Sequence, residues 1–207
     1  MPIAVACAVG YMIFSDMPVS NIQPVAPISY PTKIPSSPTS RPSSTPSIFM
    51  GEPIDYLPVL PDEFDIDYSS QIDATLEDGT KLFSVAFINK QAVFNGNLVR
   101  VFYFIYMYSS ESKAISKYQI YISDLKAEGK GNLDIGIGID GADDSLIYIV
   151  RKNSLTGEYT SRIKNVVVTT VGVPIYDPQT MTETFIKDFM ADVIGFHILG
   201  INKFSQQ

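Results

Sequence analysis

The sequence predicts an α+β fold, mainly β, in which an antiparallel sheet of about five to seven strands carries a C-terminal amphipathic helix packed on one face. Two observations support this fold class. Short apolar runs of strand length, separated by turn residues, fill the chain from about residue 81 to residue 173. After Asp177 the apolar residues change to a helical spacing. The economical arrangement is one sheet with the helix laid across it.

The strands are predicted from apolar runs and turn signals. "KLFSVAFI" (81–88) and "NLVRVFYFIYMYSS" (97–110) flank Asn95-Gly96, which favours a tight hairpin because both residues tolerate positive φ. Both faces of the second run are apolar, which predicts a central strand covered on both sides. Further strands are expected at 117–125, 131–140, 144–152 and 158–173, the last two forming a hairpin across "NSLTG".

The expected strand 131–140 has two further readings. Ile135, Ile137 and Ile139 would share one face, and two glycines on the other face would leave a groove for a closely approaching backbone. The same stretch contains "GIGIDG", a literal G-x-G-x-x-G. That fingerprint must open a helix whose N-terminus receives a pyrophosphate, whereas here it leads into Asp143, Asp144 and a β-branched run. Nucleotide binding is therefore rejected.

The C-terminal helix is predicted by its start signals and its apolar stripe. Asp177 and Pro178 suit the N-cap and first turn, and Thr180 with Glu183 has capping-box spacing. Gly200 is the expected stop. The stripe that must pack on the sheet consists of Met181, Phe185, Ile186, Phe189, Met190, Val193, Ile194 and His197.

Composition divides the chain into three parts. Residues 1–16 form an apolar N-terminal anchor or docking segment, 17–60 a Pro/Ser/Thr-rich extended spacer, and 61–207 a β-rich globular head. Eleven of the 14 prolines lie between Pro18 and Pro61, which denies that stretch helical and sheet hydrogen bonds and favours polyproline-II conformations. The spacer therefore matters mainly because it separates the other two parts.

The N-terminal segment allows three interpretations. Residues 3–14 are apolar and uncharged, but they are too few to span a bilayer, which takes about 20 residues. They suit a trimmed or mis-started signal or anchor, although a positive n-region is missing. The second interpretation is a peptide that docks on a partner or a membrane, and the third is an ordinary buried segment of the head.

Charge and rare residues exclude several functions. A net charge of −7 with 15 dispersed Lys and Arg residues argues against nucleic-acid binding. Cys7 is the single cysteine, so neither an intrachain disulfide nor a cysteine metal cluster can form. His197 is the single histidine, and its place near the end of the apolar helix favours a structural role over a catalytic one.

Two acidic groups are weak candidates for a calcium site, and no other cofactor is expected. The first group has alternate-position spacing, but Ser70 stands where an EF-hand needs glycine and Leu76 where it needs glutamate, so an EF-hand is rejected. A looser oxygen-ligand site remains open at either group. The candidate residues are Asp65, Asp67 and Asp73 in the first group, and Asp140, Asp143 and Asp144 in the second.

These observations favour a non-enzymatic, extracytoplasmic structural or interaction subunit of a membrane-associated or filamentous assembly, docked through its N-terminal segment. We expect protein partners or self-association, contact with a membrane only through residues 3–14, no nucleic acid and no catalytic residue. One alternative is a ligand-binding module that takes calcium at the acidic turns or an apolar molecule against the aromatic strand. A small hydrolase using two carboxylates is a further alternative, but no pair is marked out. The aromatic strand residues are Phe102, Phe104, Tyr106 and Tyr108.

Overall fold

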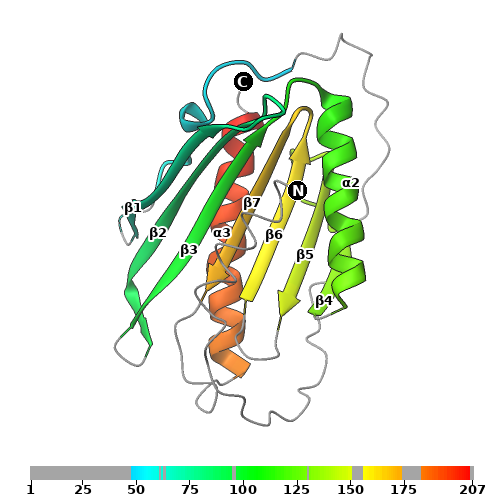
Figure 1. Cartoon of the computed structure of the whole chain (residues 1–207). Helices are drawn as coiled ribbons and strands as arrows, with labels where there is room; N and C mark the ends of the chain where they lie inside the picture. The colour runs from blue at the N-terminus through cyan, green and yellow to red at the C-terminus, as the bar shows by residue number, and fades with distance from the viewer. Residues whose placement is uncertain are drawn as a thin grey trace.

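A single seven-stranded antiparallel sheet lies between two helices in the computed structural model of the chain (Figure 1). The structure describes residues 48–60, 62, 64–94, 97–129, 131–150, 156–173 and 183–205. The N-terminal segment and most of the spacer lie outside these residues. In chain order the elements are η1 (Pro53–Tyr56), β1 (Phe64–Thr75), β2 (Lys81–Phe94), β3 (Asn97–Met107), α2 (Glu111–Glu128), β4 (Gly131–Ile135), β5 (Asp144–Val150), β6 (Thr156–Ile163), β7 (Val166–Val173) and α3 (Glu183–Ser205).

The strand order is β1-β2-β3-β7-β6-β5-β4, and every neighbouring pair is antiparallel. This confirms the predicted fold class, with its mainly β content and its C-terminal helix packed on the sheet. Both predicted hairpins are also confirmed. Phe94 pairs with Asn97 across Asn95-Gly96, and Val150 pairs with Thr156 across the second turn.

The predicted strand at 117–125 is wrong, because these residues belong to helix α2. Ser110 caps its N-terminus by accepting a hydrogen bond from the backbone N–H of Lys113, and Gly129 ends it in the left-handed conformation at φ 58°. Its buried residues have helical spacing: Ala114, Tyr118, Tyr121, Ile122 and Leu125.

Two other strand predictions are wrong in extent. Residues 131–140 hold only the short strand β4, since Gly136 at φ 77° turns the chain out of the sheet and the expected face of two glycines does not form. Residues 158–173 hold two strands instead of one. They are joined at the turn Lys164-Asn165, where Lys164 takes φ 50°, a conformation uncommon outside glycine and not marked by the sequence.

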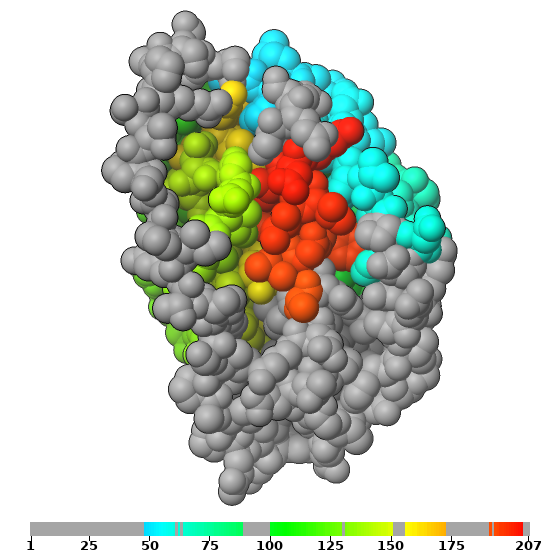
Figure 2. Space-filling model, turned by 180° about the vertical axis from the view of Figure 1, so that it is seen from behind, coloured from blue at the N-terminus to red at the C-terminus, as the bar shows by residue number. Residues whose placement is uncertain are grey.

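Helix α3 covers the centre of one side of the sheet, called here the α3 side, where it contacts β6 and β7. Figure 2 shows it from behind, between the N-terminal residues of the head and the strands at the other edge. Of the predicted stripe, Val193 and His197 are buried and Ile194 is half-buried. The residues predicted to cap the helix at 177–180 lie outside the described residues, as do the side chains of the other stripe members.

Gly200 does not end α3, contrary to the prediction, because the helix continues to Ser205. Its role is close packing. A Cβ at position 200 would meet the Tyr103 hydroxyl and lie 2.7 Å from Cζ of the same ring. Glycine therefore allows the helix to pack directly against the ring of Tyr103, which β3 contributes to the α3 side.

Residues 48–60, called here the strap, pack on the α3 side beside the helix. The Phe49 backbone N–H donates to the side-chain carbonyl of Asn165 at 2.8 Å, and the Asn165 amide donates to the carbonyl oxygens of Phe49 and Tyr108. The Tyr56 ring stacks on Phe204 at a centroid distance of 4.5 Å. The strap thus completes the cover of the α3 side, at the end of the sheet where β6 turns into β7.

Candidate docking face

The opposite side of the sheet, called here the α2 side, is covered by α2 over one half only. A helix is about 10 Å in diameter, whereas seven strands spaced about 4.8 Å apart make a sheet about 29 Å wide. Figure 1 shows α2 beside β4, β5 and β6, at the other end of the sheet from β1, and within the described residues it contacts β6 and β7. The cluster beneath α2 reaches the second half, formed by β1, β2 and β3, only at one end, through Leu82 of β2 and Tyr106 of β3.

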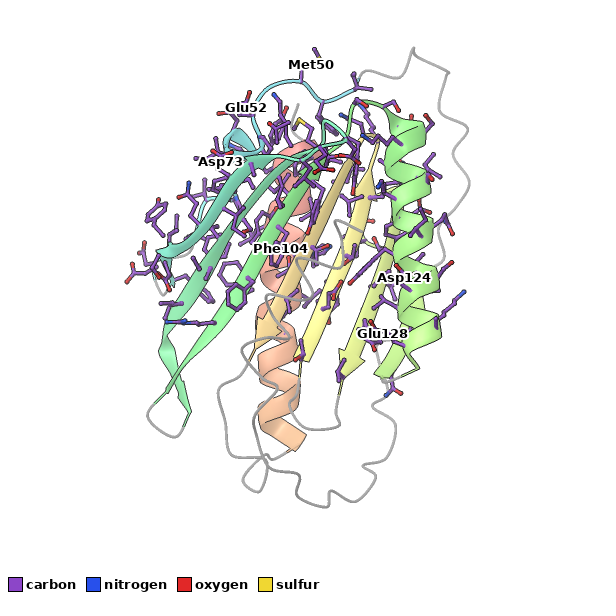
Figure 3. The ribbon with its side chains drawn as sticks, viewed as in Figure 1. Met50, Glu52, Asp73, Phe104, Asp124 and Glu128 are labelled. Atoms are coloured by element: carbon purple, nitrogen blue, oxygen red, sulfur yellow. The ribbon has the colours of Figure 1, made fainter. Side chains whose placement is uncertain are left out.

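The register of the strands places a set of apolar side chains on this second half. Phe102 pairs with Ala86 on β2 and Val171 on β7, and Phe104 lies one pleat further along the same strand. Figure 3 marks Phe104 on β3, beside the part of the sheet that α2 covers. We call this surface the aromatic face: it comprises Ile72, Ile88, Phe102, Phe104 and Val171.

The aromatic face differs from a closed core in its exposure. Phe102, Phe104, Ile88 and Val171 are half-buried, and Ile72 keeps 37% of its surface exposed. By contrast, the next aromatic residues along the chain, Tyr106 and Tyr108, are buried in the cluster beneath α2. Phe104 packs against the margin of this cluster and remains half-buried. The aromatic residues of the predicted strand therefore pass from a core beneath α2 at Tyr106 and Tyr108 to a partly exposed surface at Phe102 and Phe104.

One ion pair lies at the margin of the aromatic face. Arg100 Nη2 is 3.6 Å from Asp67 Oδ2. Asp67 also accepts hydrogen bonds from the hydroxyl and the backbone N–H of Ser69, and these bonds, together with Arg100, hold the pKa of its carboxyl below the usual range. The two charges at this margin are thus partnered, and the centre of the face carries none.

The first group of calcium candidates does not converge. Asp67 bonds Ser69 and Arg100, whereas Asp73 lies beyond an irregularity in the pairing of β1 with β2 between Asp67 and Ile72. Asp73 pairs with Phe83, so it is directed to the opposite side of the sheet from Asp65 and Asp67. The bulge therefore separates carboxylates that the sequence spacing places together.

The second group is organised around an arginine. Arg162 Nε donates to Asp144 at 2.7 Å, and its Nη1 lies 3.1 Å from Asp143 and 3.4 Å from Glu111. Asp143 also accepts the backbone N–H of Lys164. Asp140 is exposed in the preceding turn. Among the described residues, no group of three or more metal-ligating side chains is found, so calcium stays a prediction.

Glu158 is a buried carboxyl beneath α2. Its Oε1 accepts hydrogen bonds from the Tyr121 hydroxyl of α2 and from Thr160 at 2.7 Å, and Thr160 in turn lies 3.0 Å from the hydroxyl of Thr169. Burial raises the pKa of Glu158 above its usual range, although the two donated hydrogen bonds act in the opposite direction. This network ties α2 to β6 and β7.

His197 is buried beneath α3 and is held from both sides. Its Nε2 lies 2.8 Å from the Ser161 hydroxyl, which is 2.7 Å from the Ser145 hydroxyl, and its Nδ1 lies 2.9 Å from the Thr170 hydroxyl. The side chain has no exposed surface, and burial lowers its pKa to about 3. The imidazole is therefore neutral and joins the helix to β6 and β7.

The sequence does not reveal either polar network or the aromatic face. Ser161, Thr170 and Glu158 occur in ordinary strand patterns, and only the register places them opposite His197 and Tyr121. The aromatic character of Phe102 and Phe104 is visible in the sequence. Their position beyond the edge of α2 is not, because it depends on a helix that the alternation of 117–125 conceals.

Comparison with known proteins gives no relative. No family model, no curated protein and no solved structure matches the chain. Neither α2 nor the described part of any other helix is long and apolar enough to cross a membrane. Any functional conclusion therefore depends on the geometry of the described residues.

Proposed function

We propose that this chain is a non-enzymatic structural or interaction subunit of an extracytoplasmic assembly, and that its head binds an apolar segment of a protein partner on the aromatic face. The observation that carries the proposal is the half-sheet beside α2, where Phe102 and Phe104 stay half-buried at and beyond the margin of the cluster that α2 covers. Apolar surface of this kind is favourable to bury in a complex.

The character of the face supports a protein segment as its occupant. Two phenylalanine rings with flanking aliphatic side chains provide apolar contact area, and aromatic residues are enriched at the centres of protein interfaces. The Arg100 and Asp67 pair lies at the margin, where polar groups are expected in an interface.

The placement of the titratable groups supports a non-enzymatic role. Burial lowers the pKa of His197 and raises that of Glu158, and both side chains are engaged in hydrogen bonds that fasten a helix to the sheet. His197 lies on the opposite side of the sheet, and Glu158, although it is in register with Val171, is directed to Tyr121 of α2. The proposed extracytoplasmic location rests on the Pro/Ser/Thr-rich composition of residues 17–60, which is typical of stalks outside the cell.

The alternative function is binding of a small apolar molecule on the same face. It is favoured by one observation, the stacking of Phe104 on Tyr106 at a centroid distance of 6.5 Å, which extends the aromatic surface toward α2. A ligand that binds only the folded state raises the melting temperature, so melting with apolar dyes tests this alternative. Melting with Ca²⁺ and with EDTA tests the calcium prediction in the same way.

Site-specific photocrosslinking tests the proposed function. A photoreactive phenylalanine analogue replaces Phe104 in the full chain, expressed in its own cells, and the adducts are identified by mass spectrometry. Leu199 on the outer surface of α3 is a matched control, since it is 37% exposed and apolar. We expect a discrete protein adduct from position 104 that is absent from position 199.

Two further results decide the proposal. A second substitution, Phe102→Asp, should abolish the adduct at position 104 because it places a charge in the centre of the face. If position 104 forms no protein adduct, or the same adducts as position 199, the proposed function is wrong.

A further inference from the structure

The aromatic face requires an occupant that is apolar and brings little charge. Its central residues, Phe102, Phe104 and Val171, offer no polar side chain to pair with a buried charge. An unpaired charge placed over them would lose its hydration without compensation, which costs several kcal/mol. Around these residues, Arg100 and Asp67 already pair with each other. The buried carboxyl of Glu158, which is in register with Val171, already accepts hydrogen bonds from Tyr121 and Thr160.

Electrostatics also argues against two heads meeting through their general surfaces. The chain carries a net charge of −7, whereas residues 1–15 carry no charged side chain. Apposition of two acidic heads adds repulsion, while an uncharged segment can approach without it. Within this chain the segment 3–14, IAVACAVGYMIF, is apolar, uncharged and separate from the head in sequence.

The chain outside the described residues is long enough to carry that segment to another molecule. It joins the head at Ile48, next to Phe49, which Asn165 holds at the β6–β7 turn. Residues 15–47 number 33 and would span about 100 Å at about 3.1 Å per residue in the polyproline-II conformation that their composition favours. Strand β2, the longest of the sheet with 14 residues, is only about 46 Å long at about 3.3 Å per residue.

We propose that residues 3–14 of a second copy of this chain bind the aromatic face, so that each molecule offers a segment to one neighbour and a face to another. This inference rests on the proposed function, because it names the partner of the same face. The contact is heterologous, since segment and face are different surfaces, and repetition of such a contact gives rings or open filaments.

The single cysteine of the chain makes the proposal testable by disulfide crosslinking. Cys7 lies in the middle of the segment 3–14. One full-length chain keeps Cys7, and a second carries Cys7→Ala together with Phe104→Cys. Each has one thiol, so the disulfide between positions 7 and 104 can join only two different molecules. We expect this mixed dimer under mild oxidation, at yields well above those of either chain alone.

Two variants control for position and folding. Cys7→Ala with Leu199→Cys places the thiol on the outside of α3 at a comparable exposure, and we expect at least tenfold less mixed dimer from it. Val171→Cys in place of Phe104→Cys probes the same face from β7 and replaces a smaller side chain. Circular dichroism of each chain confirms that the sheet and helices form.

The outcomes separate this inference from the proposed function. A third chain carries both Cys7 and Phe104→Cys. If this chain closes an internal disulfide while the mixture gives no dimer, the segment binds its own head and the proposal is overturned. Absence of any disulfide at both 104 and 171 overturns it as well. In either case a protein adduct at position 104 in cells would leave the proposed function standing with a different partner.

Discussion

The two sides of the sheet differ in how completely they are covered, and this difference separates fold from function. On the α3 side the helix and the strap together bury Phe83, Phe87 and Tyr103 completely. On the α2 side a single helix of 18 residues leaves Phe102 and Phe104 half-buried. The α3 side therefore provides most of the stability of the fold, and the α2 side retains apolar surface for a partner.

The sides also differ in the polar group that each one buries. Beneath α3 the buried group is a neutral imidazole, His197, surrounded by hydroxyls. Beneath α2 it is a carboxyl, Glu158, that accepts hydrogen bonds from Tyr121 and Thr160. Burial disfavours the charged form of each group. Acid forms the imidazolium of His197, whereas base forms the carboxylate of Glu158.

The largest expected effect is a loss of stability when a phenylalanine is removed, and it is tested by comparing one phenylalanine from each side of the sheet. Phe83→Ala, on the α3 side, should lower the free energy of unfolding by about 3–5 kcal/mol, because it removes a fully buried ring and leaves a cavity. Phe104→Ala should cost roughly half as much or less, because its ring already contacts solvent. Urea unfolding followed by circular dichroism measures both. Equal losses would contradict the difference in cover between the two sides.

Much of this architecture is predictable from the sequence, and the failures have physical causes. The hairpin at Asn95-Gly96 and the C-terminal helix carry strong local signals. The alternation of Tyr118, Ile120 and Ile122 predicts a strand where helix α2 lies, although Ile120 is exposed on the helix. Its real signals are the cap at Ser110 and the left-handed Gly129.

The candidate site was the least predictable part for a related reason. Pairing in the sheet brings together residues that are distant in sequence, such as Phe102 with Val171. Gly200 illustrates the same limit, since a glycine near a helix end resembles a stop until the ring of Tyr103 is placed against it. Local patterns specify elements, whereas contacts between elements specify the site.

The second prediction is that acid lowers the stability of the fold through His197 on the α3 side. The folded-state pKa of His197 is about 3, below its unfolded value of about 6.5, so its contribution to stability is complete above pH 6.5 and is lost as pH falls toward 3. The expected loss between about pH 7.5 and about pH 5 is about 2 kcal/mol. Urea unfolding at a series of pH values measures it.

His197→Gln isolates that contribution. The amide can still donate and accept hydrogen bonds, but it does not titrate. We expect this variant to be less stable than the natural chain at neutral pH and to lack the decline between about pH 6.5 and about pH 5. A variant that retains the full decline would show that another group is responsible. Carboxylates contribute chiefly at lower pH, since their unfolded pKa values are about 4.

The third prediction compares two glycines of α3. Gly200→Ala should destabilise by about 1–3 kcal/mol, because the new Cβ would overlap Tyr103 at the contact between helix and sheet. Gly195→Ala should stabilise by up to about 1 kcal/mol, since no atom lies within 4 Å of the new Cβ and alanine favours the helix. Thermal and urea unfolding of the two variants should shift in opposite directions. A neutral Gly200→Ala would mean that α3 does not pack so close to the ring of Tyr103.

The smallest effect is expected from Glu158 on the α2 side, and its direction is opposite to that of His197. Because its folded-state pKa is raised, its contribution to stability is complete below the unfolded value of about 4.5 and is lost as pH rises through the folded-state pKa. Glu158→Gln keeps an acceptor for Tyr121 and Thr160 but cannot ionise. From about pH 4.5 to the folded-state pKa of Glu158, the natural chain should therefore lose stability that Glu158→Gln keeps, so the variant should gain relative to the natural chain as pH rises. Because this window overlaps that of His197, the comparison is made in a His197→Gln background, where the imidazole does not titrate. A difference in the free energy of unfolding that stays constant with pH would show that Glu158 does not stay protonated above its unfolded pKa, and that α2 buries no titrating carboxyl.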